Sequence, residues 1–182
     1  MTTTKSIARR RRVGLISLGC AKNLVDAEIM LGSLLRDGVE IVNDPAEADA
    51  VIVNTCSFID AAQEESVDTI LESTELRGRT RPDQAVIVSG CMPQRFRDEL
   101  PRLMPEVDVF MGIDQVEQVG ALVEQAIASR AARTPSNDPT APISNPGVKA
   151  RLADIGTRQP KPAESEPSLR GTEKFGKTKQ VV

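Results

Sequence analysis

The sequence contains no histidine, tryptophan or tyrosine, and only four phenylalanines among its 182 residues. Without histidine the chain cannot by itself form a Cys–His dyad, a Ser–His–Asp triad or an imidazole metal site. Because aromatic residues make up only 2% of the chain, its core must be built from Val, Ile, Leu and Ala, which is typical of a parallel α/β sheet. No apolar run reaches the roughly 18–20 residues that span a bilayer, so we expect no membrane partner.

Charge is distributed unevenly along the chain. Residues 1–12 carry five basic and no acidic residues, 13–130 carry nine basic and 21 acidic residues, and 131–182 carry nine basic and five acidic residues. An acidic body disfavours direct nucleic-acid binding, since phosphate attracts basic surfaces. Residues 1–12 are predicted to be a basic, disordered N-terminus. Residues 131–182 hold seven of the 12 prolines without apolar periodicity, and are predicted to be a disordered linker or tail.

Between these termini, residues 13–130 alternate short apolar runs with helical patterns and are predicted to form one domain. The expected strands are 13–18, 39–42, 51–54, 85–89 and 107–111. The alternation predicts an α/β fold: an open, five-stranded parallel sheet, doubly wound and flavodoxin-like, with strand order 2-1-3-4-5.

Four helices are expected between and after these strands. The first is predicted to have Asn23 as its N-cap and to stop at Gly38. The second is predicted to begin with a capping box at Ser57 and end near Leu76. The others are predicted from Cys91 to about Pro105 and from Asp114 to about Arg130. The apolar face expected for the first helix consists of Leu24, Ala27, Leu31, Leu34 and Leu35.

Three cysteines, the only ones in the chain, each follow a short apolar run: Cys20, Cys56 and Cys91. In the expected order their strands are neighbours, so the thiols should meet at the carboxyl edge of the sheet, where open α/β sheets bind ligands. Adjacent strands lie about 4.8 Å apart, which suits an iron–sulfur cube. A helix N-terminus after each cysteine would favour the thiolate. Gly19 and Gly90 would let a bulky ligand approach the backbone.

Several interpretations of the thiols stay open on spacing alone. They are a 4Fe–4S cluster with one iron lacking a protein ligand, a zinc ion with three thiolates and water, or inert buried thiols. Structural zinc sites favour Cys-x-x-Cys pairs, which are absent, so the cluster is favoured. A cytoplasmic location is expected, where thiols stay reduced and a disulfide is disfavoured. Asn23 and Ser57 are interpreted as helix caps rather than ligands.

The segments around the cysteines carry a resemblance to a known family. They read Ser17-Leu-Gly-Cys-Ala-Lys-Asn-Leu-Val-Asp-Ala-Glu28, Val53-Asn-Thr-Cys-Ser-Phe-Ile-Asp-Ala-Ala62 and Ser89-Gly-Cys-Met-Pro-Gln94. Together they resemble the N-terminal domain of methylthiotransferases, radical S-adenosylmethionine enzymes that thiomethylate tRNA adenosines or a ribosomal-protein aspartate. The first two segments are closer to the ribosomal-protein (RimO-type) branch, because the tRNA branch more often reads Gly-Cys-Gln-Met-Asn in the first. The resemblance covers roughly residues 13–130.

The resemblance implies that Cys20, Cys56 and Cys91 bind an auxiliary 4Fe–4S cluster, whose open iron holds the sulfur delivered to the substrate. Asn23 matches an asparagine near that cluster and is a weaker candidate. A small-subunit ribosomal protein is the implied substrate; the alternatives are a tRNA methylthiotransferase domain or a cluster-free interaction module.

Complete members of the family also carry a radical-S-adenosylmethionine barrel with a Cys-x-x-x-Cys-x-x-Cys motif, which holds a second cluster, and a small C-terminal domain. Neither is found here, since all three cysteines are already used. The chain is therefore expected to be truncated before the radical domain, or to need such a half in trans. Alone it should bind a cluster without completing methylthiolation, and we assign it no catalytic residue.

Overall fold

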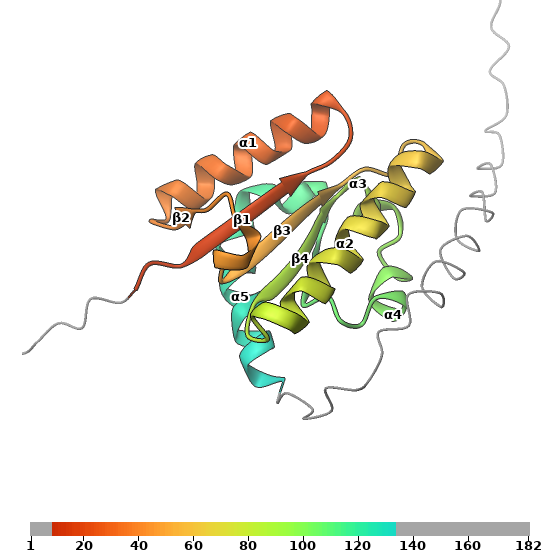
Figure 1. Cartoon of the computed structure of the whole chain (residues 1–182). Coiled ribbons are helices and arrows are strands. Elements are labelled where there is room, and N and C mark those ends of the chain that lie inside the picture. The colour runs from red at the N-terminus through yellow and green to blue at the C-terminus, as the bar shows by residue number, and fades with distance from the viewer. Residues whose placement is uncertain (1–8, 134–182) are drawn as a thin grey trace, which may run out of the picture.

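The computed structural model describes residues 9–133 as a five-stranded sheet with helices on both faces (Figure 1). The strands are β1 (Arg12–Ser17), β2 (Glu40–Ile41), β3 (Ala50–Thr55), β4 (Ala85–Gly90) and β5 (Val109–Met111). The α-helices are α1 (Ala21–Arg36), α2 (Asp60–Thr80), α3 (Cys91–Arg95), α4 (Leu100–Leu103) and α5 (Val119–Ala132). Two 3-10 helices are η1 (Pro45–Glu47) and η2 (Ile113–Gln118). Apart from residues 131–133, the predicted tail lies outside the described residues.

The strand order is β2-β1-β3-β4-β5 and every pair is parallel, which confirms the predicted topology. β3 pairs with β1 from Val13↔Ala50 to Ser17↔Asn54. On its other side it pairs with β4 from Ala50↔Ala85 to Thr55↔Gly90. The three strands that precede the cysteines are therefore neighbours and end at nearly the same level.

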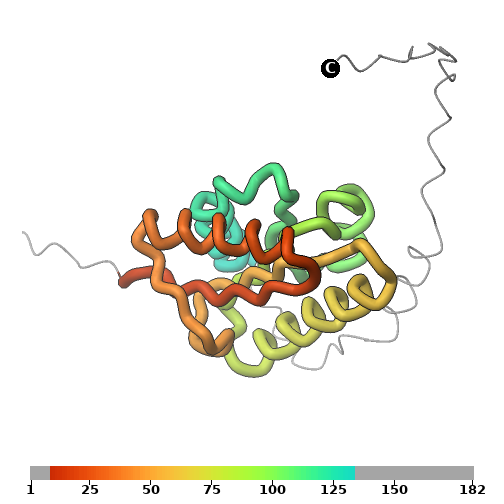
Figure 2. The backbone as a smooth tube through the Cα atoms, turned by 90° about the horizontal axis from the view of Figure 1, so that it is seen from above, coloured from red at the N-terminus to blue at the C-terminus, as the bar shows by residue number. Residues whose placement is uncertain are grey.

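Two apolar cores lie on opposite faces of the sheet. α1 and α5 cover one face and α2 the other, as seen from above in Figure 2. Residues of β3 alternate between them: Ala50 and Ile52 belong to the first core, and Val51 and Val53 to the second. All six residues of β3 are buried. This is the pattern of a central parallel strand covered on both faces, as its continuous apolar run predicts.

The predicted face of the first helix is only partly right. Ala27 and Leu34 are buried together with Met30, but Leu24 and Leu35 are exposed. Polar Asn23 shares the buried face, because its side chain hydrogen-bonds to backbone carbonyls there. Leu24 and Leu35 each follow a residue of the buried face directly, so the helical repeat places them off that face.

The expected helix from Cys91 to Pro105 is broken into α3 and α4. Pro101 accounts for the break, because a proline in a continuous helix lacks the N–H donor and clashes with the carbonyl four residues earlier. In α4 it occupies the first turn, where this costs nothing. The last helix also differs from expectation, since η2 precedes α5 and Gly112, not Asp114, is the residue before η2.

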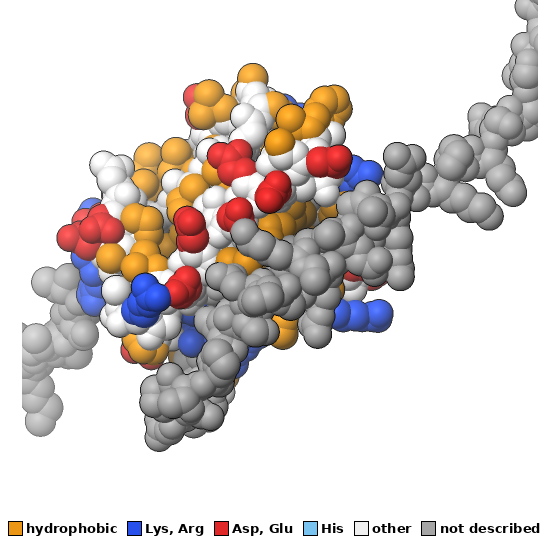
Figure 3. Space-filling view, turned by 45° about the vertical axis from the view of Figure 1, so that its right-hand side comes forward, with side chains coloured by type: hydrophobic (Ala, Val, Ile, Leu, Met, Phe, Trp, Pro, Cys, Tyr) orange, Lys and Arg blue, Asp and Glu red, His pale blue; other side chains and the backbone are white. Residues whose placement is uncertain are grey.

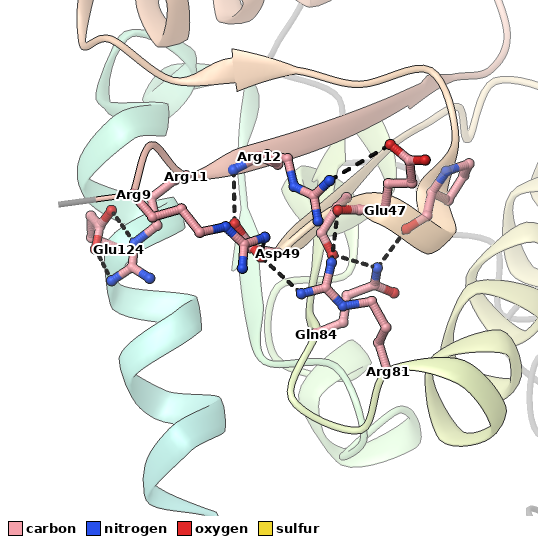
Figure 4. Close-up of polar contacts among 10 residues, drawn as sticks. Arg9, Arg11, Arg12, Glu47, Asp49, Arg81, Gln84 and Glu124 are labelled. Carbon is pink, nitrogen blue, oxygen red and sulfur yellow. Dashed lines mark hydrogen bonds and ion pairs between the residues drawn. The ribbon is translucent and has the colours of Figure 1, made fainter. Parts of the chain in front are cut away.

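The amino ends of the strands are joined by a cluster of polar contacts (Figure 4). Asp49, just before β3, accepts a hydrogen bond from the Arg12 backbone N–H (2.9 Å) and pairs with Arg81 (2.8 Å) and Arg9 (3.2 Å). Gln84 donates to the carbonyls of Pro45 (2.6 Å) and Ala48 (2.9 Å). The disorder expected for residues 1–12 therefore does not extend to Arg9 or to Arg12, the first residue of β1.

Candidate metal centre at the carboxyl edge of the sheet

The fold brings the three cysteines to one edge, immediately after three neighbouring strands. Cys20 precedes α1 as its N-cap residue, Cys56 directly follows β3, and Cys91 is the first residue of α3 after β4. All three are free: Cys20 is exposed, Cys91 is partly buried and Cys56 is buried. Solvent exposure therefore decreases from Cys20 to Cys91 to Cys56.

Asn23 lies between two of the thiols. Its side-chain oxygen is 3.7 Å from the Cys91 sulfur and 4.0 Å from the Cys20 sulfur, both within reach of weak S–H hydrogen bonds. Because both distances end on the same oxygen, the two sulfurs lie close to one another beside this amide. The structure thus brings together Cys20, Cys91 and the weaker candidate Asn23.

Asn23 is not the N-cap that its spacing predicts. α1 begins at Ala21, so Asn23 lies in the first turn, fully buried. Its amide nitrogen instead donates to the carbonyls of Leu18 (2.8 Å) and Thr55 (2.9 Å). The side chain therefore joins the loop before α1 to the end of β3.

The backbone of Cys56 is held by the side-chain hydroxyl of one serine. The Cys56 N–H donates to the Ser66 hydroxyl, which donates to the Cys56 carbonyl, each over 3.1 Å. Ser66 lies in α2 and is completely buried. Sequence reasoning missed this residue, because a serine inside a helical pattern carries no signal of which backbone it will contact.

The segment after Cys56 differs from its predicted capping box. α2 begins at Asp60 with Ile59 as its N-cap residue, so Ser57 is not a cap and Cys56 is not at the helix N-terminus. The Ser57 carbonyl instead accepts hydrogen bonds from Gln63 (3.3 Å) and Arg95 (3.2 Å). Arg95, one turn after Cys91, thereby ties the two cysteine loops together.

Gly19 and Gly90 have positive φ angles, 92° and 98°, which disfavour any other residue. A Cβ at Gly19 would lie 2.9 Å from the Cys56 sulfur and still closer to its Cβ. One at Gly90 would lie 2.9 Å from the Thr55 nitrogen and closer to its carbonyl oxygen. The glycines thus make room for Cys56 and the neighbouring strand, which is a different reason from the open approach for a ligand that we expected.

A buried network of polar side chains connects the segments that carry the three cysteines. Asn54 donates to the Asn23 carbonyl (2.8 Å), and the Ser89 hydroxyl donates to the Asn54 side-chain oxygen (3.3 Å). The Thr55 hydroxyl donates to the Ser89 carbonyl (2.6 Å). These side chains link the ends of β3 and β4 to the first turn of α1, so the three cysteine-bearing segments form one connected unit.

The surroundings affect two of the thiols in opposite directions. Hydrogen bonds from the backbone N–H groups of Asn23 and Lys22 lower the pKa of the Cys20 thiol below its ordinary value. Burial raises the pKa of the Cys91 thiol, and the nearby Lys22 ammonium offsets this only in part. The expected preference for thiolate thus holds for Cys20 and not for Cys91.

The site offers three thiols as donors. Within residues 9–133 no three Cys, Asp or Glu side chains are arranged to hold one metal ion. A tetrahedral zinc ion needs its thiolates at about 2.3 Å. In a cube each thiolate binds a different iron, so the sulfurs stand farther apart, and thiolates are the ligands that such clusters use. Thiols are thus the right kind of donor for a cluster, and Cys20, Cys56 and Cys91 are the residues that would hold one.

Large apolar side chains lie exposed in the segments that follow Cys20 and Cys56. Phe58 is 87% exposed, and Leu24, Val25 and Ile59 are between 53% and 57% exposed. The space-filling view in Figure 3 shows hydrophobic side chains interspersed with acidic ones on the face it presents. In the part of the chain that the structure describes, no helix is long and apolar enough to cross a membrane.

Comparison with known proteins supports the resemblance seen in the cysteine segments. Residues 12–112 match the family described as uncharacterized protein family UPF0004, which is the methylthiotransferase N-terminal domain. The chain belongs to this family. All three cysteines and Asn23 fall inside the matched range.

Proteins named ribosomal protein uS12 methylthiotransferase RimO are among its relatives. The chain is 49% identical over 118 residues to the protein from Geobacter sulfurreducens, covering 64% of this chain and 26% of that protein. The relative from Akkermansia muciniphila is 50% identical over 117 residues, covering 63% and 26%. That from Opitutus terrae is 50% identical over 131 residues, covering 70% and 27%. The chain therefore spans about a quarter of the length of these relatives.

Proposed function

We propose that this domain binds one 4Fe–4S cluster through Cys20, Cys56 and Cys91 and serves methylthiolation of ribosomal protein uS12. The observation that carries the proposal is the meeting of three free thiols at one sheet edge in a methylthiotransferase-family domain. The cluster would supply sulfur at the iron that no cysteine binds. The names of the relatives support the ribosomal-protein substrate over a tRNA substrate.

The residues of the chain divide the work of holding such a cluster. Cys56, buried and fixed by Ser66, would anchor the inner side, while exposed Cys20 would leave the outer side accessible. Lys22 lies two residues after Cys20, and Arg95 lies four residues after Cys91. Their positive charges would offset the negative charge of three thiolates in a partly dehydrated site. Free thiols also suit a reducing compartment, so we propose the cytoplasm.

Completion of the reaction would need a radical-S-adenosylmethionine domain with its own cluster. The exposed apolar side chains beside the thiols, Leu24, Val25, Phe58 and Ile59, support docking of such a domain at this edge. The catalytic half would belong to a longer chain or act in trans. The acidic body of residues 13–130 supports a protein partner over direct nucleic-acid binding.

The test is anaerobic reconstitution followed by measurement of iron and acid-labile sulfide per chain, with the visible absorption spectrum. We expect about four of each and a brown chromophore. Cys20→Ala, Cys56→Ala and Cys91→Ala should each lose most of the iron. Thr74→Val is the control, since it removes a buried hydroxyl in α2 that donates to the Leu71 carbonyl within the same helix.

Three results would redirect the proposal. A colourless chain without iron would leave an interaction module, and one zinc per chain would indicate a mononuclear site. Retention of a full cluster by all three cysteine variants would show that other groups bind it.

A further inference from the structure

The side chain of Asn23 contacts or adjoins every part of the three-thiol site. Its oxygen faces the sulfurs of Cys20 and Cys91 at 4.0 and 3.7 Å, and its nitrogen binds the carbonyl of Thr55, the residue before Cys56. Its second N–H bond goes to Leu18, two residues before Cys20. A single amide thus bonds to the backbone near Cys20 and Cys56, and its oxygen lies near the sulfurs of Cys20 and Cys91.

The amide has one orientation that satisfies all of its groups. Both N–H donors of the side chain are used on carbonyls at 2.8 and 2.9 Å, so the oxygen must point toward the thiols. Reversing the amide would place an oxygen against two carbonyl oxygens and leave buried acceptors unpaired, which is costly in a fully buried position. The sulfurs therefore face a fixed oxygen rather than a rotating group.

The backbone of Asn23 is held as well. Its carbonyl accepts the Asn54 side-chain donor at 2.8 Å, and Asn54 itself accepts from Ser89 on β4. The residue is consequently braced from β3 through its side chain and through its main chain. These bonds connect the first turn of α1 to the loop before Cys20 and to the end of β3.

We propose that Asn23 is the positioning residue of the three-cysteine site: it holds the loops of Cys20 and Cys56 at a fixed spacing before any cluster binds. It acts through the loops and is not itself a ligand, since cluster irons prefer thiolate to amide oxygen. The effect on the bound cluster rests on the proposed function. The effect on the loops does not, because the bonds to Leu18 and Thr55 join protein atoms only.

The experiment compares the full chain with Asn23→Ala, Asn23→Asp and the control Thr74→Val. Asn23→Asp keeps the side-chain volume but replaces the donors, so it separates lost bonds from a cavity. Thr74→Val removes a buried side-chain donor far along α2, where it contacts the Leu71 carbonyl. Circular dichroism would establish that each variant is folded.

The first readout is hydrogen exchange in the metal-free chains. Both Asn23 variants should exchange the amides of residues 18–22 and 55–58 at least about tenfold faster, while the rest of 9–133 stays as in the parent. Thr74→Val should leave these segments unchanged. Unchanged exchange in both Asn23 variants, or a uniform rise over the whole domain, would overturn the positioning role.

The second readout is iron uptake and the rate of iron loss to a chelator after reconstitution. The Asn23 variants should lose iron about 10–100-fold faster than the parent, as expected for a residue that orients ligands. Iron loss at the parental rate would show that Asn23 has no role toward the cluster. If the parent itself takes up no iron, the proposed function fails, and hydrogen exchange alone decides the role of Asn23.

Discussion

Different kinds of residues lie at the amino and carboxyl edges of the sheet. At the amino edge, Asp49 and Gln84 precede β3 and β4 and bond to neighbouring segments (Figure 4). Asp108 precedes β5 and accepts a hydrogen bond from the Val86 N–H. At the carboxyl edge, glycines with positive φ and short polar side chains surround the thiols, and the Cys20 and Cys91 sulfurs lie 3.7 Å or more from the Asn23 side-chain oxygen. The comparison indicates that ion pairs hold the segments of the amino edge, whereas uncharged side chains hold those of the carboxyl edge and leave the thiols with weak side-chain contacts.

The largest loss of stability is expected from the amino edge, in Arg77→Met. The Arg77 guanidinium donates to Asp108 (3.0 Å) and to the Glu106 carbonyl (3.0 Å), and the Arg77 and Asp108 side chains are only 5% and 0% exposed. Removing the cation leaves a buried carboxylate whose remaining cation, Arg133, is 3.4 Å away. We expect a fall in unfolding free energy of about 3 kcal/mol, measured by urea denaturation.

The same variant sharpens the comparison of the edges. If the amino edge contributes only stability, folded Arg77→Met should take up the same iron per chain as the parent. A loss of stability below about 1 kcal/mol would contradict a dominant buried pair.

At the carboxyl edge, Gly90→Ala should destabilise the metal-free chain by about 2–3 kcal/mol, because it combines a strained φ with a clash against the Thr55 backbone. It should also displace Cys91 and lower iron uptake. Gly78→Ala is the control, since a Cβ there meets nothing within 4 Å and the residue lies in α2. That control should stabilise the chain slightly, by about 0.5–1 kcal/mol. Equal behaviour of the two variants would contradict the steric argument.

The sheet and the grouping of the cysteines were predictable from the sequence, because apolar runs and the parallel topology determine them without knowledge of side-chain partners. The helix boundaries were less predictable. Ser57 has the spacing of a capping box, yet its carbonyl is used by Gln63 and Arg95 from other segments. Pro101 was the available signal for the break between α3 and α4.

The supporting residues of the site could not be predicted from local pattern. Asn23 has cap-like spacing but binds Leu18 and Thr55, and the latter lies 32 residues away in the chain. In the sequence Ser66 cannot be told from other small helix residues, and its bond to Cys56 follows from the packing of α2. Both roles depend on contacts between distant segments, which periodicity does not encode. Leu24 and Leu35 were expected on the buried face of α1 but are exposed, since that face holds polar Asn23 together with Ala27, Met30 and Leu34.

A smaller effect, dependent on pH, is expected from Asp49→Asn at the amino edge. Burial raises the pKa of the Asp49 carboxyl, but the Arg12 N–H bond and the Arg81 and Arg9 cations outweigh it and lower the pKa below its ordinary value. A carboxyl with a lowered folded-state pKa stabilises the fold above its unfolded pKa of about 4 and loses this contribution as pH falls through the folded value. We expect the variant to be about 1 kcal/mol less stable at pH 7.

Urea denaturation of the metal-free parent and Asp49→Asn at pH 7, 5 and 3 would measure this. The difference in unfolding free energy should be similar at pH 7 and 5 and smaller at pH 3. A difference that grows on acidification would contradict the sign of the pKa shift.

The smallest change in stability is expected from Phe58→Ser, although it tests whether the carboxyl edge is a docking surface. Phe58 is 87% exposed, so its removal should alter the unfolding free energy by less than about 0.5 kcal/mol and leave iron uptake unchanged. Binding to the remaining part of the Geobacter relative, expressed separately and measured by calorimetry, should weaken by about tenfold. Leu35→Ser is the matched control: its side chain is 60% exposed, but it lies in the last turn of α1, at the opposite end from Cys20. Equal weakening by both substitutions would mean that general surface apolarity, and not the rim of the thiol site, drives the association.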